Sequence, residues 1–265
     1  MQTIYLLFFI PVLVACYPAS SQEEKRAVQD SLRGDSSLVE LDPYAIDSLT
    51  YELMADSLRS YSELLQLANT KRQSWQTKLA ATTNPSSIDT LLKEAGKDLE
   101  GVLVQGLFPF WYGTPWDFNG ISNVPGEGQI ACGYFVSTTL KHVGFSLNRY
   151  KVAQQSSKRA CEIFARGEKV LKISPEDVEA LKRKLENLEP GLYCVGLDYH
   201  VGFLLKRKDR YFFIHSSYFG VDGVVIEPVE TSMAFYSQTY YLSPITTNKV
   251  LVRDWVEGRE ISWNL

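Results

Sequence analysis

The pattern of apolar residues changes at Gly191, and this change limits the folds open to the chain. Before Gly191, apolar residues recur at the three- and four-residue spacing of amphipathic helices. After it, short β-branched and aromatic segments separated by turn residues predict strands. Helices followed by an antiparallel meander indicate an α+β fold rather than alternating α/β. The expected strands are residues 192–197, 199–206, 211–216, 224–227, 239–242 and 250–253.

Residues 132–143 are expected to form a helix that begins at a cysteine. Counting from Cys132, apolar residues at positions +3, +4, +8 and +11 lie on one helical face, and Gly144 fits the position just past a helix end. A thiol at a helix N-terminus lies at the positive end of the macrodipole and near free backbone N–H groups, and both favour the thiolate. Cys132 is therefore a candidate nucleophile, and a buried structural cysteine is the alternative.

Two of the chain's three histidines fall within one expected hairpin, formed by residues 199–206 and 211–216. If the turn is symmetric about residues 208–209, the numbers of opposed residues sum to 417. His200 and His215 are then diagonal neighbours on one face of the sheet. The third, His142, falls in the last turn of the cysteine helix, where a cation suits the helix dipole, and we expect it at the surface.

A cysteine at a helix start and two imidazoles on one sheet face are the groups that catalysis by a thiol nucleophile requires. One imidazole takes the thiol proton, and a second polar group holds that imidazole in the required tautomer. The sequence therefore predicts Cys132 as nucleophile, His200 as base and His215 as its orienting partner. Two buried structural histidines are one alternative, and a zinc site with these three ligands is another. No HExxH or paired-cysteine spacing supports a metal, and no cofactor is expected.

The segments around the two histidines, residues 200–204 and 213–217, resemble the NlpC-type papain-like cysteine peptidases of bacterial cell walls. Residues 112–116 resemble the segment that precedes the catalytic helix of that family, and the resemblance covers roughly residues 105–217. It implies a papain-like fold with the nucleophile helix packed on an antiparallel sheet. It also implies hydrolysis of amide bonds in the peptide stems of peptidoglycan by a Cys-His-His triad. The family usually has Asp-Cys-Ser-Gly at residues 131–134, where this chain has Ala-Cys-Gly-Tyr.

That departure leaves the substrate open. An amidase or a thiol acyltransferase acting on another amide, and an inactive binding module of the same fold, are the alternatives. The resemblance also implies that the backbone N–H of Cys132 helps to bind an oxyanion, with Tyr112 or Gln129 as a second donor. The aromatic segment 108–120, which includes Trp116, is expected either to line a substrate groove or to be core pinned by turns.

The N-terminus carries an expected export signal. Residues 4–14 form an apolar run that is too short to span a bilayer. Leu-Val-Ala-Cys at residues 13–16 resembles the lipobox of bacterial lipoprotein signal peptides. This implies a signal peptide over residues 1–16, a lipid anchor on Cys16, and a periplasmic or cell-surface location. The net charge of −4 without a basic tract argues against nucleic acid as a partner.

The remaining sequence divides into three parts. Residues 17–41 are polar and predict a flexible tether. Residues 42–85 predict one long helix, or a hairpin kinked near residues 69–70, which packs on the main domain or binds a protein partner through residues 43–81. Breaker residues then mark the start of the catalytic domain, 86–265.

Two further features concern this last part of the chain. A helix is expected to begin at Ser174-Pro175, with Ser174 as its N-cap. Apart from Cys16 and Cys132 the chain has two cysteines, Cys161 and Cys194, and they form a possible disulfide.

Overall fold

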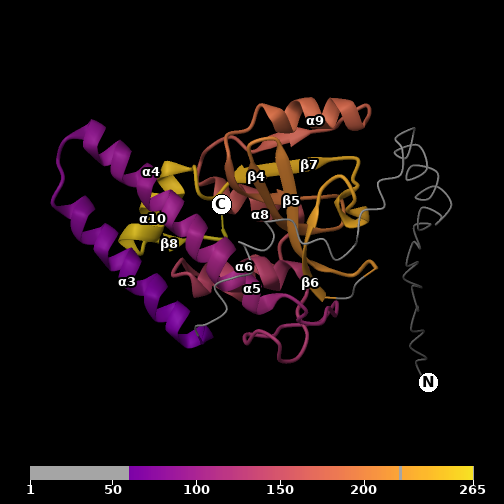
Figure 1. Cartoon of the computed structure of the whole chain (residues 1–265), viewed down its shortest axis with the longest axis horizontal. Helices are drawn as coiled ribbons and strands as arrows, with labels where there is room; N and C mark the ends of the chain where they lie inside the picture. Colours follow the sequence, from indigo (N-terminus) through magenta and orange to yellow (C-terminus); the bar gives the residue numbers. More distant parts are fainter. Residues whose placement is uncertain (1–59, 221–222, 265) are drawn as a thin grey trace, which may run out of the picture. The chain divides into compact units, whose positions relative to one another are not determined.

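The computed structural model describes residues 60–220 and 223–264. Cys16, the expected tether 17–41 and the first part of the expected helical segment 42–85 lie outside the described residues. The described part of the chain is an α+β fold in which helices precede, flank and follow an antiparallel sheet (Figure 1). No helix in this part of the chain is both long and apolar enough to cross a membrane.

The elements follow one another in this order along the chain. The helices are α3 (Tyr61–Ala80), α4 (Pro85–Gly101), the π-helix η1 (Val102–Leu107), α5 (Phe108–Trp111), α6 (Cys132–His142), α7 (Arg149–Ala153), α8 (Ser157–Ala165), α9 (Val178–Glu186), the 3₁₀ turn η2 (Met233–Phe235) and α10 (Lys249–Glu257). The strands are β1 (Ser146–Leu147), β2 (Leu171–Ile173), β3 (Gly191–Gly196), β4 (Val201–Arg207), β5 (Arg210–Ser217), β6 (Gly223–Pro228), β7 (Tyr240–Pro244) and β8 (Glu260–Ile261).

Six of the strands form one sheet in the order β2-β7-β3-β4-β5-β6, with every neighbouring pair antiparallel. The predicted meander is confirmed for the four consecutive strands β3 to β6. It is wrong for β7, which follows β6 in the chain but pairs with β3, on the edge of β3 that faces away from β4. β1 and β8 form a separate parallel pair.

The hairpin that carries the histidines has the predicted register. Phe203 opposes Ile214 and Leu204 opposes Phe213, so the residue numbers of each pair sum to 417. Lys208 adopts a positive φ of 50° in the two-residue turn that joins the strands. Gly202 therefore lies opposite His215, with room for no side chain: a Cβ atom there would come within 2.8 Å of His215 Cβ.

The two faces of the sheet are buried under different elements. Phe203 and Phe212 on one face belong to the main core, which includes Phe135 of α6. Leu204 and Phe213 on the other face belong to a second core, formed with apolar residues of α9 and η2. Strands covered on both sides read as continuous apolar runs, which is why β3 to β5 stand out in the sequence.

The N-terminal helices pack as part of the same unit. Ala68 and Trp75 of α3 share the main core with residues of α4 and α10, and Trp75 Nε1 donates to Asp98 of α4 at 2.9 Å. α3 passes residues 69–70 without a break, so the predicted kink there is wrong. Ser60 caps its start reciprocally with Glu63, so a single helix over the whole segment is also wrong.

Two further expectations are corrected by capping. Residues 250–253 belong to α10 rather than to a strand, because the Asn248 side chain accepts from the first backbone N–H groups of a helix and Gly258 ends that helix at a φ of 69°. α9 begins after Asp177, whose side chain accepts from Ala180 N, and not at Ser174.

Candidate active site

Cys132 is the first residue of α6, and the residue is half-buried. The segment before it is tied to the sheet, since Ser216 Oγ of β5 donates to Ile130 O at 2.6 Å. The first turn of α6 also lies against α7, where a Cβ on Gly133 would be 2.4 Å from Ala153 O. These contacts fix the start of the helix next to the strand that carries His215.

Burial raises the pKa of the Cys132 thiol, and the backbone N–H groups of Val201, Gly133 and Cys132 itself, which act in the opposite direction, do not offset that effect. The shift is opposite in direction to the one expected from the helix terminus, because desolvation of the charge outweighs it. The contact with Val201 N–H nevertheless places the thiol beside the start of β4, next to His200.

His200 and His215 lie together, as the hairpin register predicts. His200 immediately precedes β4, His215 lies in β5, and the two are buried with His200 Nε2 2.8 Å from His215 Nδ1. Phe213 stacks on His215 with ring centroids 4.0 Å apart, and the ring of Tyr218 meets that of His200 edge-on at 5.2 Å. Aromatic rings therefore hold both imidazoles in fixed orientations.

The hydrogen-bonded row continues into residues that the sequence did not single out. His215 Nε2 lies 3.0 Å from Glu227 Oε1 in β6, and Ser232 Oγ donates to the same oxygen at 2.5 Å. His215 opposes Val225, so Glu227 is its diagonal neighbour, as His200 is on the other side. The diagonal rule that pairs the histidines would have found Glu227, had the register of β6 been known from the sequence.

Burial sets the protonation of this row. It lowers the pKa of His200 well below the ordinary value, with the charge of His215 acting in the same direction. It also lowers the pKa of His215, against the opposing effect of Glu227. For Glu227 burial acts to raise the pKa, but the hydrogen bonds from His215 and Ser232 outweigh it and the pKa is lowered. At neutral pH the row is thus two neutral imidazoles and one carboxylate.

The remaining nitrogen of His200, Nδ1, is buried and has no hydrogen-bond partner among the described residues. The ring of Tyr218 packs edge-on against that of His200, and Tyr218 is also near Cys132: burial raises the pKa of its phenol, and a thiolate at Cys132 would raise it further. Cys132, His200 and Tyr218 therefore converge at the start of β4. Since Nδ1 has no partner, the thiol and the imidazole are not hydrogen bonded in this structure.

The three weaker candidates have different positions. Trp116 lies at the site, with its ring 5.7 Å from that of Tyr218. Tyr112 packs against the main core, burial raises the pKa of its phenol, and its hydroxyl has no partner within the described part of the chain. Gln129 is exposed. The aromatic segment divides accordingly: Phe108 and Trp111 are fully buried core, and Trp116 lies at the site.

His142 is not the charged surface residue that its position predicts. Its Nδ1 lies 2.7 Å from the hydroxyl of Tyr61 and its Nε2 lies 3.2 Å from Asn123 Oδ1. Burial, together with the charges of Arg149 and Lys141, lowers its pKa to about 4. His142 is therefore a neutral link between α3, α6 and the loop that precedes Cys132.

Cys161 and Cys194 are buried free thiols with their sulfur atoms 3.7 Å apart, so the structure contains no disulfide between them. Cys161 Sγ also donates to Tyr241 O at 3.2 Å. Cys161 lies in α8 and Cys194 in β3, and both pack in the main core as small apolar residues.

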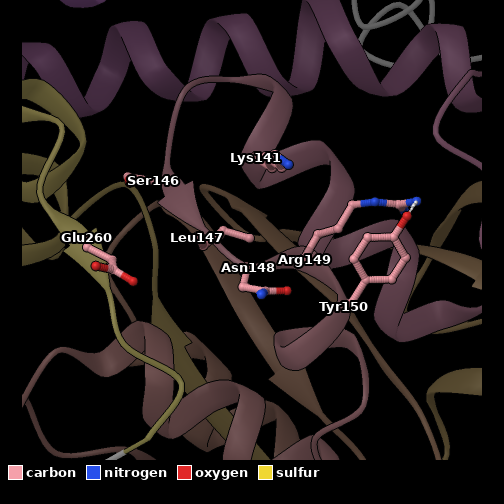
Figure 2. Close-up of a pocket in the computed structure, with 7 residues that line it drawn as sticks. All are labelled: Lys141, Ser146, Leu147, Asn148, Arg149, Tyr150 and Glu260. Atoms are coloured by element: carbon pink, nitrogen blue, oxygen red, sulfur yellow. Dashed lines mark hydrogen bonds between the residues drawn. The ribbon is translucent and has the colours of Figure 1, made fainter.

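A pocket of about 460 Å³ lies beside α7, and its lining does not include Cys132, His200 or His215. Figure 2 shows Glu260 across it from Arg149 and Tyr150. The guanidinium of Arg149 is buried and donates to Thr138 Oγ1 at 2.8 Å and Ile121 O at 2.9 Å. It therefore fixes the loop before Cys132, a structural role for which a lone arginine in a short helix gives no sequence signal.

The geometry argues against a zinc site formed by Cys132, His200 and His215. Both ring nitrogens of His215 are occupied by hydrogen bonds to His200 and Glu227. Across residues 60–220 and 223–264, no three His, Cys, Asp or Glu side chains are grouped as metal ligands.

Comparisons with protein-family models, with curated proteins and with solved structures each found no match.

Proposed function

We propose that this chain is a papain-like cysteine hydrolase of the NlpC type that cleaves an amide bond in peptidoglycan stem peptides. The observation that carries the proposal is the 2.8 Å hydrogen bond between His200 and His215. It leaves the buried Nδ1 of His200 without a partner among the described residues. The next residue, Val201, directs its backbone N–H at the Cys132 thiol. A nucleophile, a base and an orienting group are the three parts that thiol catalysis requires.

The reaction proceeds in two halves. His200 Nδ1 takes the thiol proton as Cys132 Sγ attacks the amide carbonyl, and backbone N–H groups at the start of α6 face the resulting oxyanion. The C–N bond then breaks, and His200 returns its proton to the leaving amine. Water, deprotonated by His200, attacks the thioester, the acid product leaves, and the thiol regains its proton. Neutral groups at the start are consistent with proton transfer in the same step as attack.

The substrate class and location rest on other features. The segments around the histidines resemble a cell-wall peptidase family, and the expected lipobox at Cys16 would hold the protein on the membrane, facing the wall. Trp116 and Tyr218 form an aromatic wall beside His200, where a peptide can pack.

The first experiment uses purified full-length protein with Cys16→Ser, defined muropeptides and mass spectrometry of the products. We expect cleavage of one amide bond by this protein and none when Cys132→Ala is added, with the same far-UV circular dichroism for both. Activity that survives Cys132→Ala would show that another residue is the nucleophile.

An inactive binding module is the second candidate. The raised pKa of Cys132 and the unpartnered His200 Nδ1 favour it, because neither group is activated in the free protein. The same experiment separates the two functions: a binding module retains muropeptides, measured by calorimetry, but releases no product.

A further inference from the structure

Glu227 and Ser232 continue the hydrogen-bonded row beyond the three residues that a Cys-His-His mechanism needs. We propose that Glu227, held by Ser232, is a positioning residue that fixes the proton of His200 on Nε2 and so keeps Nδ1 bare as the base. This inference rests on the proposed function and names a fourth and a fifth residue for the same site.

The donor–acceptor direction of the hydrogen bonds in this row is fixed by Ser232, at the end farthest from His200. Phe235 N–H donates to Ser232 Oγ at 3.1 Å, so the hydroxyl hydrogen of Ser232 points to Glu227 Oε1, 2.5 Å away. An ionised carboxylate accepts hydrogen bonds and cannot donate them. The proton in the 3.0 Å contact between His215 and Glu227 therefore sits on His215 Nε2.

The tautomer of His215 then determines that of His200. A neutral imidazole has one N–H, so with its proton on Nε2 the Nδ1 of His215 is an acceptor. His200 Nε2 must donate across the 2.8 Å contact, and its single proton is thereby assigned. His200 Nδ1 is left with its lone pair, and this is the buried atom that has no partner within the described residues.

A carboxylate is needed for this direction, and an amide of the same shape is not sufficient. Gln at position 227 could present its NH₂ group to His215, which would then carry its proton on Nδ1 and donate to His200 Nε2. His200 would hold its own proton on Nδ1, and that nitrogen could then not act as base. Glu227 also stabilises the positive charge that forms on the imidazole pair when the thiol gives up its proton.

Glu227 can be replaced at little cost to the fold. Its side chain is 33% exposed, and β6 is the edge strand of the sheet. A loss of activity on substitution therefore reports on the row of hydrogen bonds rather than on folding. Glu230, an exposed carboxylate just after β6, provides the matched control.

The experiment compares the full chain with Glu227→Gln, Ser232→Ala and Glu230→Gln, each labelled with ¹⁵N-histidine. Long-range ¹H–¹⁵N correlation spectra report which ring nitrogen carries each proton, without any need for activity. We expect protons on Nε2 of His200 and His215 in the parent chain and in Glu230→Gln, and a shift toward Nδ1 in Glu227→Gln. With muropeptides we expect kcat to fall at least about tenfold in Glu227→Gln, less in Ser232→Ala, with KM unchanged.

The two readouts separate failure of this inference from failure of the proposed function. If the parent chain hydrolyses muropeptides and Glu227→Gln keeps both Nε2 protons and full kcat, the role of Glu227 is overturned while the hydrolase stands. If the tautomers reverse in Glu227→Gln but the parent chain cleaves nothing, Glu227 positions the histidines and the proposed function fails.

Discussion

At the scale of single residues, burial favours the neutral forms of both Cys132 and His200. Both side chains are largely removed from water, so burial raises the pKa of the thiol and lowers that of the imidazole. Charge separation is disfavoured on both sides. The helix N-terminus alone predicts the opposite for Cys132, and desolvation by burial reverses that expectation.

The neutral thiol leads to a testable pH dependence. Alkylation by iodoacetamide requires the thiolate, so we expect the rate at Cys132 to be low at pH 6 and to rise with a midpoint above the ordinary cysteine value of roughly 8.5. The measurement follows the Cys132 peptide by mass spectrometry in protein with Cys16→Ser, while Cys161 and Cys194 stay unmodified because they are buried. A rate that is already maximal at pH 6 would contradict this reading.

At the scale of elements, the end of α9 depends on a side chain from a neighbouring strand. Lys206 of β4 is buried, and its Nζ donates to the carbonyl oxygens of Leu185 at 3.1 Å and of Glu186 and Leu188 at 2.6 Å. The last carbonyls of a helix have no partners within the helix. One ammonium group therefore satisfies two of them, together with the carbonyl of Leu188 just past the helix, and couples α9 to the sheet.

We expect Lys206→Met to lower the free energy of unfolding by about 2–3 kcal/mol, because charge-assisted hydrogen bonds are lost and the carbonyls are left unpaired. Urea titration at pH 7 measures the change. Lys184→Met, which removes an exposed charge from the last turn of the same helix, should change the stability by less than about 0.5 kcal/mol. Equal effects of the two substitutions would mean that charge near the helix end, and not hydrogen bonding, is responsible.

The sequence predicts elements well where their cause is local. The hairpin that contains His200 and His215 was predictable down to its register, because a two-residue turn and alternating side chains determine it. The place of β7 beside β3 was not, because that pairing joins residues about fifty positions apart. The strand predicted for residues 250–253 was wrong for another reason. A short apolar run fits a strand or a helix equally well, and here the N-cap Asn248 starts a helix.

The candidate site follows the same division. His200 and His215 meet within one hairpin, whereas Glu227 reaches them only through the register of the next strand. The pKa of Cys132 is set by burial, with Val201 N–H acting in the opposite direction, and no spacing along the chain reveals either effect. Residue types and local geometry were therefore accessible from the sequence, and burial was not.

At the scale of the whole described unit, one partly buried polar cluster joins the N-terminal helix to the site. Trp111 Nε1 donates to the hydroxyl of Tyr61 at 2.9 Å, and that hydroxyl bonds His142 Nδ1 at 2.7 Å. His142 Nε2 meets Asn123, which lies in the loop before Cys132. α3 is thus connected to the end of α6 and to the approach to the nucleophile, and this cluster needs His142 to be neutral.

Protonation of His142 should therefore weaken the unit in mild acid. The folded-state pKa of about 4 lies below the ordinary 6.5, so the unfolded chain binds the proton first as pH falls. The contribution of His142 is complete above pH 6.5, declines between 6.5 and 4, and is lost below 4. We expect a loss of about 2 kcal/mol across this window. Because His200 and His215 act in the same direction, the measurement is the difference in urea stability between the parent chain and His142→Gln at pH 7 and pH 4.5. That difference should shrink in acid, and a constant difference would mean that His142 does not titrate there.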